Sequence, residues 1–248
     1  MSTQEDKNYP FVSVVTPTYN RRRFIPHLIQ MYEHQDYKKT RMEWIILDDG
    51  QEKVQDLFEE AAKRIPNIRY ISLDEKLTIG AKRNRLNEEA KGSLVVAMDD
   101  DDYYFPCRVS AVVNAFKQKQ NANVELAGAS EIYMYYSDIK TIYKLGPYHD
   151  KHATNGTMAW RASYGKSHRY DETVTHSEER SFLEDYKNPM IQLDAFKVML
   201  VMSHSENTFD KKKLRDQESP FIKKTDMKLK NFLKEKNEKD LREFFANA

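Results

Sequence analysis

Residues 94–102 read LVVAMDDDD, an apolar run of strand composition that ends in four consecutive aspartates. Like charges gathered at the end of a strand repel one another unless a cation neutralises them. Carboxylate oxygens are suited to Mg²⁺ or Mn²⁺, above all when diphosphate oxygens complete the coordination. The stretch therefore predicts a divalent-metal site at Asp99 to Asp102, with a solvated acidic turn as the alternative interpretation.

The chain around these aspartates alternates between strand and helix patterns. Strand-like apolar runs occupy residues 11–16, 44–47 and 68–73, and helical spacing of apolar residues is found at 24–32, 54–65, 79–91 and from Pro106. This alternation is typical of βαβ units around a parallel sheet, whose ligands bind beyond the carboxyl ends of the strands. We therefore expect the polar clusters at 16–21, 48–50 and 99–102 to converge.

The pattern changes after residue 124. Shorter strands, expected at 125–130, 132–136, 141–145 and 156–163, indicate a smaller antiparallel part, and a helix is expected at 178–186. From about residue 219 the chain is rich in Lys and Glu, with apolar residues at roughly helical spacing. We expect an amphipathic helix there that packs on the domain, with docking to a membrane surface or to a partner as the alternatives.

Composition and charge restrict the function classes. The 248 residues include 40 Lys and Arg against 39 Asp and Glu, which argues against a general nucleic-acid binder. The single cysteine, Cys107, allows no internal disulfide. The first nine residues are polar, and no window approaches the roughly 18 apolar residues of a membrane span. We therefore expect a soluble protein of the cytosol without a transmembrane segment.

Four short motifs follow one another in order, each at a predicted strand-to-helix junction. They are TPTYNR at 16–21, DDG at 48–50, GAKRN at 80–84, and MDDDD at 98–102 with Pro106. Together they resemble the ordered signature of family 2 glycosyltransferases over roughly residues 10–210. The resemblance implies an α/β protein of the Rossmann-like GT-A fold, with a mainly parallel central sheet flanked by helices. It also implies an enzyme that moves a sugar, with inversion, from a nucleoside diphosphate sugar to a hydroxyl of a glycan or other acceptor.

On this resemblance the chain divides into a polar tail at 1–9, a glycosyltransferase domain at 10–218 and a helical tail at 219–248. Residues 10–123 would form the nucleotide-binding half, and residues 124–218 the acceptor-side half. UDP is the favoured carrier, with dTDP and GDP left open. The sequence leaves the sugar, the acceptor and the oligomeric state undecided.

The resemblance also implies roles in binding the donor. Pro17, Thr18 and Tyr19 would line the nucleoside pocket, Asp48 or Asp49 would hydrogen-bond the base, and Lys82, Arg83 and Asn84 would contact the base and phosphates. Asp99 would face the ribose, and Asp101 would ligate the Mn²⁺ or Mg²⁺ ion that bridges the diphosphate. Asp100 belongs to the same donor-binding set, and Asp102 would orient its neighbours. The alternative for Arg83 is a surface position on an amphipathic helix.

On the acceptor side, residues 156–161 resemble a strand that flanks the acceptor in some members. Trp160 would stack on a sugar ring, or else fill the core. Glu178 and Glu179 occupy the place of a Glu-Asp motif, so we expect Glu179 as the catalytic base and Glu178 as its substitute. Acids that only favour the helix dipole are the alternative. His204 to Thr208 resemble an element that closes over the diphosphate, with His204 as a metal or phosphate ligand and Asn207 in the donor site.

Two other function classes compete with this interpretation. A nucleotidyltransferase that makes nucleotide-sugars would need a Gly-rich phosphate loop after the first strand, and residues 16–23, TPTYNRRR, contain no Gly. A non-catalytic carbohydrate-binding module would have no use for four acids and a separate acidic pair. Thermal melting with different nucleotides in the presence of Mn²⁺ would separate the three classes, because a carbohydrate-binding module should show no stabilisation by any nucleotide.

Overall fold

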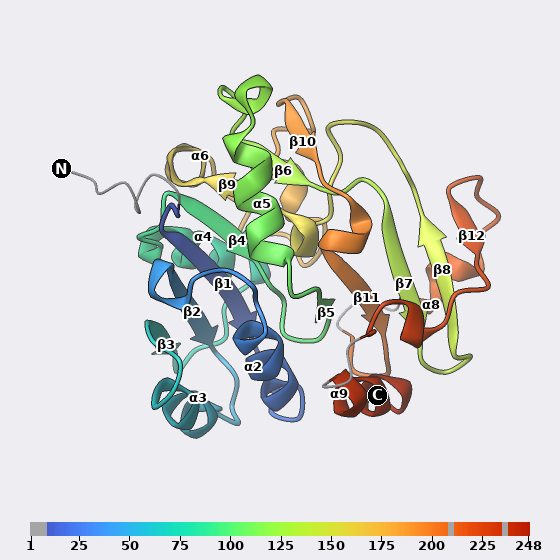
Figure 1. Cartoon of the computed structure of the whole chain (residues 1–248), viewed down its shortest axis with the longest axis horizontal. Coiled ribbons are helices and arrows are strands. Elements are labelled where there is room, and N and C mark those ends of the chain that lie inside the picture. Colours follow the sequence, from blue (N-terminus) through green and yellow to red (C-terminus); the bar gives the residue numbers. More distant parts are fainter. Residues whose placement is uncertain (1–8, 208–210, 235–237) are drawn as a thin grey trace.

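The structure, a computed structural model, describes residues 9–207, 211–234 and 238–248. Most of the predicted polar tail at 1–9 lies outside the described residues. So does Thr208, the last residue of the element predicted to close over the diphosphate. The chain forms two β-sheets with helices packed around them (Figure 1). None of the described helices is long and apolar enough to cross a membrane.

The larger sheet has the strand order β10-β6-β9-β4-β1-β2-β3. Strands β3, β2, β1 and β4 run parallel, and β9 is antiparallel to both β4 and β6. The strands are β1 (Val12–Thr18), β2 (Met42–Asp48), β3 (Ile68–Ser72), β4 (Leu94–Ala97), β6 (Leu126–Gly128), β9 (Ala159–Arg161) and β10 (Met190–Gln192). The structure is thus an α/β protein with a mixed sheet, mostly parallel in its core.

Continuous apolar runs form the central strands because both faces of this sheet are covered. In β2, Trp44 and Ile46 pack into one core cluster, whereas Ile45 and Leu47 pack into the cluster on the opposite face. Side chains of a strand alternate between its two faces, so a doubly buried strand needs apolar residues in succession. Buried polar side chains of β1 are satisfied by hydrogen bonds: Ser13 donates to Glu43 at 2.6 Å, and Thr16 donates to the Met98 carbonyl at 2.7 Å.

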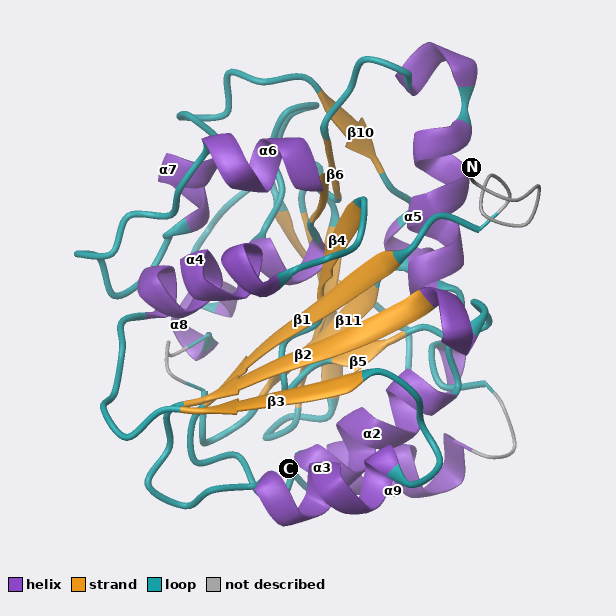
Figure 2. Cartoon of the chain, turned by 90° about the vertical axis from the view of Figure 1, so that its left-hand side faces the viewer, coloured by secondary structure: helices purple, strands orange, loops and turns teal. Residues whose placement is uncertain are grey.

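Helices cover both faces of the larger sheet. Figure 2 shows α4, α6 and α7 on one side, and α2, α3 and α9 on the other. The helices are α2 (Ile25–Glu33), α3 (Gln55–Ala62), α4 (Ile79–Glu89), α5 (Arg108–Lys117), α6 (Ala162–Ser167), α7 (Glu179–Phe182), α8 (Lys212–Arg215) and α9 (Lys239–Ala246). Helix α4 begins at Thr78, whose hydroxyl accepts a hydrogen bond from the Ala81 amide.

The smaller sheet has the order β12-β8-β7-β11-β5. Its strands are β5 (Tyr103–Tyr104), β7 (Ile132–Tyr136), β8 (Thr141–Leu145), β11 (Met199–Ser203) and β12 (Ile222–Lys224). All pairs are antiparallel except β7 with β11. Strand β5 follows the aspartates directly, so Asp99 to Asp102 lie on the connection between the two sheets.

Two predicted elements are wrong in extent. The helix expected at 178–186 is a single turn, α7, which ends where Glu184, Asp185 and Tyr186 adopt positive φ angles. The strand expected at 156–163 is reduced to β9, between a 3₁₀ turn at Asn155–Thr157 and helix α6. Both segments are shaped by contacts with distant parts of the chain, which periodicity does not record.

The C-terminal tail is not the single amphipathic helix that we predicted for 219–248. Among its described residues, β12 adds to the smaller sheet, a 3₁₀ turn follows at Leu229–Asn231, and α9 forms the end. Phe232, Leu233, Leu241 and Phe245 are all buried in the main core cluster. These apolar side chains are therefore used in packing against the domain.

Candidate functional site

Each of the four aspartates after β4 has a different partner. Asp100 accepts a hydrogen bond from the Thr18 hydroxyl at 2.6 Å, and Asp102 accepts one from the Met202 amide at 2.7 Å. Asp99 pairs with Arg83 Nη1 at 3.1 Å. Asp100 and Asp102 are buried, whereas Asp99 and Asp101 are partly exposed. The turn therefore directs alternate carboxylates, those of Asp99 and Asp101, toward the solvent side.

The protonation of these carboxyls reflects crowding. Burial, followed by the charge of Asp101, raises the pKa of Asp100 to about 8. Burial opposes ionisation of Asp101 as well, but the hydrogen bond with His204 and the charges of Lys211 and Arg21 hold its pKa below the usual range. Clustered carboxylates that disfavour one another's charge are stabilised when positive charge is brought to them.

Asp101, His204 and Asn207 come together as the sequence predicted. Asp101 Oδ2 is 3.2 Å from His204 Nε2 and also 3.2 Å from Asn207 Nδ2. Asn207 in turn accepts a hydrogen bond from the His204 amide at 2.7 Å. A strand end and a turn after β11, about a hundred residues apart in sequence, thus supply one polar cluster.

Asp101 and His204 offer an oxygen and a nitrogen to a divalent ion. Among the residues that the structure describes, no group of three or more His, Cys, Asp or Glu side chains is arranged to hold a metal ion. Two ligands leave most positions of a Mg²⁺ or Mn²⁺ ion to other oxygens, such as those of a bound diphosphate. The pair fits a metal held jointly by the protein and its ligand.

Arg83 is the side chain that joins the two acidic segments. Its Nη1 lies 3.1 Å from Asp99 Oδ1, and its Nε donates to Glu178 Oε1 at 2.8 Å. Although burial disfavours a charged guanidinium, Asp99 and Glu178 raise the pKa of Arg83. The alternative of a solvent-exposed Arg83 on helix α4 is therefore wrong, since only 8% of this residue is exposed.

Glu178 and Glu179 differ in their surroundings. Glu178 is buried and paired with Arg83. Within the described ranges no Lys, Arg or His forms an ion pair with Glu179. Burial, and next the charge of Glu178, raise the pKa of Glu179 to about 7. A carboxyl of this kind can accept a proton near neutral pH.

The turn after β2 uses Asp48 and Asp49 differently. Asp48 is fully buried and accepts hydrogen bonds from the Gly50 and Val54 amides at 2.8 and 3.1 Å. It holds the turn, which leaves Asp49 as the other member of the pair predicted to hydrogen-bond the base. Asp49 accepts from the Leu77 amide at 2.7 Å and pairs with Lys82 at 2.8 Å.

The residues beside this turn include Pro17, buried at the end of β1, and Tyr19, which is partly exposed. Lys76 Nζ lies 4.0 Å from the centroid of the Tyr19 ring, and Lys82 Nζ lies 5.6 Å from it. Cationic groups over an aromatic ring are a favourable arrangement. Tyr19, Lys82 and Asp49 thus form a second polar group beside the aspartates.

Two predicted ligand contacts are corrected. Asn84 uses its amide on the backbone N–H and carbonyl of Tyr170, both at 2.9 Å, and on Glu172, so it anchors that loop. Trp160 is 2% exposed, and its Nε1 donates to Asn87 at 3.0 Å. Trp160 therefore fills the core, because β9 lies inside the sheet between β4 and β6.

Sequence reasoning missed three contributors to the site. Arg21 lies 3.8 Å from Asp100 and 3.7 Å from Asp101. The Asn155 amide contacts Arg83 and the hydroxyl of Tyr170, the latter at 2.7 Å. Arg21 belonged to the TPTYNR motif, and its place at a strand end was a usable signal. Asn155 and Tyr170 gave no signal.

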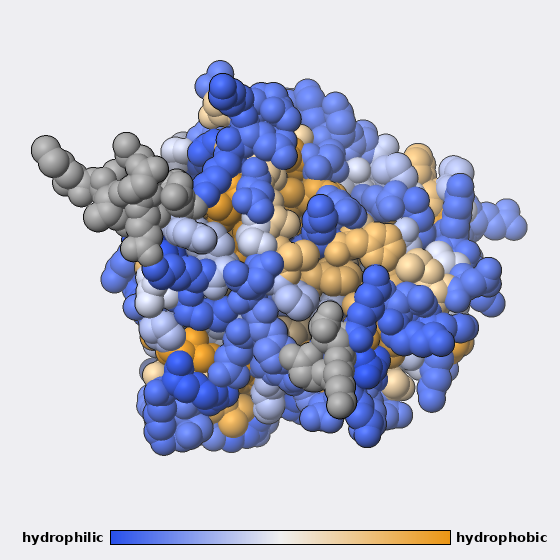
Figure 3. All heavy atoms as spheres, in the orientation of Figure 1, coloured by the Kyte–Doolittle hydropathy of each residue, from blue (hydrophilic) through white to orange (hydrophobic). Residues whose placement is uncertain are grey.

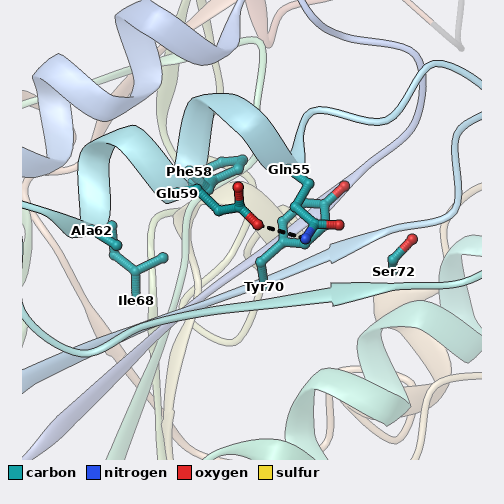
Figure 4. A pocket seen from close by; sticks show the side chains of 7 residues that line it. All are labelled: Gln55, Phe58, Glu59, Ala62, Ile68, Tyr70 and Ser72. Carbon is teal, nitrogen blue, oxygen red and sulfur yellow. Dashed lines mark hydrogen bonds between the residues drawn. The ribbon is translucent and has the colours of Figure 1, made fainter.

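Two hollows of the surface lie elsewhere. One is formed by α3 and β3, with Phe58 and Tyr70 among its walls (Figure 4). The other lies between α5 and the segment after β10. Neither is lined by a residue that we predicted for the site.

Comparison with known proteins places these motifs in a family. Residues 13–216 match the model of glycosyl transferase family 2. A protein of Escherichia coli K12 named as a colanic acid biosynthesis glycosyl transferase is 34% identical over 114 residues, or 46% of this chain and 40% of that protein. The poly(ribitol-phosphate) beta-N-acetylglucosaminyltransferase TarS of Staphylococcus aureus is 30% identical over 93 residues, or 37% of this chain and 16% of TarS.

Solved structures agree in fold. TarS residues 1–349 in complex with UDP-GlcNAc match with a TM-score of 0.63 and 18% identity, over 79% of this chain and 59% of that one. The mannosyltransferase PcManGT from Pyrobaculum calidifontis, in complex with GDP-Man and Mn²⁺, matches with a TM-score of 0.62 and 14% identity, over 80% and 58%. The predicted GT-A fold is confirmed. The chain spans less than two thirds of the length of each of these relatives.

Proposed function

Because the chain belongs to glycosyl transferase family 2, we propose that it transfers a sugar from a nucleoside diphosphate sugar to an acceptor hydroxyl, with inversion. The observation that carries the proposal is the bridge formed by Arg83. This one side chain contacts Asp99 of the aspartate turn and Glu178 of the acidic pair. The acids proposed to bind the donor and those proposed to act on the acceptor would then lie on either side of a single guanidinium.

Glu179 is the proposed catalytic base. In inversion, the acceptor oxygen forms a bond to the anomeric carbon as the bond from that carbon to the diphosphate oxygen breaks. The acceptor proton passes to the Glu179 carboxylate, and the nucleoside diphosphate leaves. The pKa of about 7 suits Glu179 to this step, because a base works best when its pKa is near the working pH. Glu178 forms an ion pair with Arg83 and thereby positions the Arg83 guanidinium.

Asp101 and His204 are the proposed ligands of a Mn²⁺ or Mg²⁺ ion. When bound, the ion supplies positive charge that stabilises the leaving diphosphate. Arg21 lies beside the same carboxylates and is suited to contact phosphate oxygens as well. Asp99 would face the ribose, and Tyr19, Asp49 and Lys82 would lie on the nucleoside side.

UDP is the proposed nucleotide, supported by TarS, which was solved with UDP-GlcNAc, whereas PcManGT was solved with GDP-Man. Calorimetry with UDP, GDP and dTDP, each with Mn²⁺ and with chelator, tests the carrier and the metal together. We expect UDP to bind in the presence of Mn²⁺ and to bind far more weakly with chelator. Binding of none of the three nucleotides would contradict the proposed function.

The family match favours this function over a nucleotidyltransferase and over a non-catalytic carbohydrate-binding module. A nucleotidyltransferase would consume a nucleoside triphosphate and release pyrophosphate, whereas a glycosyltransferase releases the nucleoside diphosphate. A panel of nucleotide-sugars screened for slow hydrolysis identifies the donor. Release of the nucleoside diphosphate in that screen identifies a glycosyltransferase and not a nucleotidyltransferase.

A further inference from the structure

An aromatic cluster lies at the surface beside the acidic pair. It consists of Tyr148, His149, His152, Tyr186 and Phe221, which come from three separate segments of the chain. His152 stacks on Tyr186 with ring centroids 5.2 Å apart, and Tyr148 contacts both His152 at 4.7 Å and Phe221 at 5.3 Å. His149 meets Tyr186 edge to face at 5.5 Å. The rings form a continuous group.

The cluster lies at the surface, and only Tyr186 among its members packs against a core cluster. Tyr148 is 37% exposed and Phe221 is 42% exposed, and His149 is exposed as well. Most of the molecular surface drawn in Figure 3 is hydrophilic, with smaller apolar patches between the polar side chains. Exposed aromatic side chains gathered in one group mark a site of interaction.

Hydrogen bonds fix the segment that carries Tyr148 to His152. Gln192 Nε2 donates to the carbonyls of Asp150 and His152 at 2.7 and 3.2 Å. Lys151 Nζ donates to the Lys187 carbonyl at 3.0 Å. Figure 1 shows this segment leaving β8 and arching toward β10. The rings are therefore held in place before any ligand arrives, which lowers the entropic cost of binding.

The cluster is near the proposed catalytic base along the chain. Tyr186 follows α7, on which Glu179 stands, and is the last of three successive residues with φ between 48° and 60°. Left-handed conformations in non-glycine residues are costly and gather at functional sites. Burial, and next the charge of Glu179, raise the pKa of the Tyr186 hydroxyl. His152 lies three residues before Asn155, which contacts Arg83.

We propose that Tyr148, His152, Tyr186 and Phe221 form an acceptor subsite that binds a pyranose ring of a carbohydrate. This inference rests on the proposed function, since it names the substrate class that Glu179 would deprotonate. One face of a pyranose presents C–H groups, which pack on aromatic rings, while its hydroxyls lie at the edge. The exposed His149 ring, which meets Tyr186, supplies a polar edge for those hydroxyls.

The test uses saturation-transfer NMR with three neutral trisaccharides as probes: chitotriose, cellotriose and mannotriose. We expect the full chain to transfer magnetisation to the ring protons of at least one of them. Tyr148→Ala and Phe221→Ala should each weaken that binding about tenfold. Phe196→Ala is the matched control, because Phe196 is also 37% exposed but lies outside the cluster, and it should bind like the wild type.

UDP calorimetry on the same proteins separates this proposal from the proposed function. Tyr148→Ala should bind UDP with Mn²⁺ as tightly as the wild type. If the wild type binds UDP but none of the trisaccharides, the subsite is wrong and the donor function stands. Equal loss of trisaccharide binding in Phe196→Ala would also overturn the subsite. Trisaccharide binding without any nucleotide binding would contradict the donor function alone.

Discussion

The ring of Phe24 packs against the imidazole of His204, with their centroids 4.8 Å apart. Phe24 also meets Phe244 of α9 edge to face at 5.3 Å, and Phe244 lies 3.9 Å from the His27 ring. A second contact joins Tyr103, which follows Asp102, to Glu238 at 2.5 Å. The C-terminal segment therefore supports both sides of the proposed metal site.

Phe244→Ala should lower the free energy of unfolding by about 2 kcal/mol, because an aromatic ring is removed from a packed contact. It should also weaken UDP binding in the presence of Mn²⁺, since His204 loses the support that reaches it through Phe24. Phe245→Ala is the control. Phe245 is buried in the core, and among the described rings it contacts Phe244 and not Phe24, so its loss should reduce stability and leave UDP affinity unchanged.

Asp101→Asn should remove most of the gain in UDP affinity that Mn²⁺ provides, because the amide is a poorer ligand for a hard cation. The chain should remain folded, as the amide can still accept a hydrogen bond from Asn207. Calorimetry with and without chelator measures the difference. Asp74→Asn, an exposed position, should behave like the wild type. Equal affinity with and without chelator in the wild type would exclude the metal.

Glu179→Gln should reduce the rate of transfer about a hundredfold or more while UDP affinity is retained, because the acceptor proton then has no base to receive it. Glu184→Gln, on the exposed segment just after α7, is the control and should keep near-normal turnover. Near-normal turnover in Glu179→Gln would move the role of base to another acid.

The pH profile follows from the same group. Because the pKa of Glu179 is about 7, a larger fraction of it is ionised as the pH rises through 7. The kcat/KM for transfer should therefore increase from pH 6 to 8 and then level off. This limb should be absent from the residual activity of Glu179→Gln. A flat profile in the wild type between pH 6 and 8 would contradict the assignment.

Arg83→Lys keeps the positive charge but lacks the two-pronged group that reaches both Asp99 and Glu178. One of these carboxylates should lose its partner, and the free energy of unfolding should fall by about 3 kcal/mol. Transfer should fall as well. Arg85→Lys, two residues after Arg83 and exposed, should change neither quantity. Urea denaturation measures the first effect, and donor turnover measures the second.

Much of the fold was determined by local sequence. The runs before Thr18, Asp48 and Asp99 formed parallel strands, because a strand buried on both faces requires successive apolar residues. Parallel strands bring their carboxyl ends to one edge, so the predicted meeting of the 16–21 and 98–102 motifs also followed, as the Thr18–Asp100 contact shows.

Tertiary structure decided which polar residues are free to act. Asp48 and Asn84 belong to the DDG and GAKRN motifs, yet their side chains form hydrogen bonds with the backbone of Gly50 and Tyr170. Glu178 and Glu179 are adjacent and chemically alike, and only the arrival of Arg83 from α4 distinguishes them. Motif spacing records which residues are present, but their role depends on partners that are distant in sequence.

The sequence by itself thus determined the fold class, the family and the position of the aspartate turn. The course of the tail, the burial of Trp160 and the surface cluster around Tyr148 were decided by the tertiary structure alone. The physical reason is that periodicity measures how one segment meets a generic apolar surface. Which surface a segment meets, and which hydrogen bonds remain unused there, is set by contacts between residues that folding brings together from far along the chain.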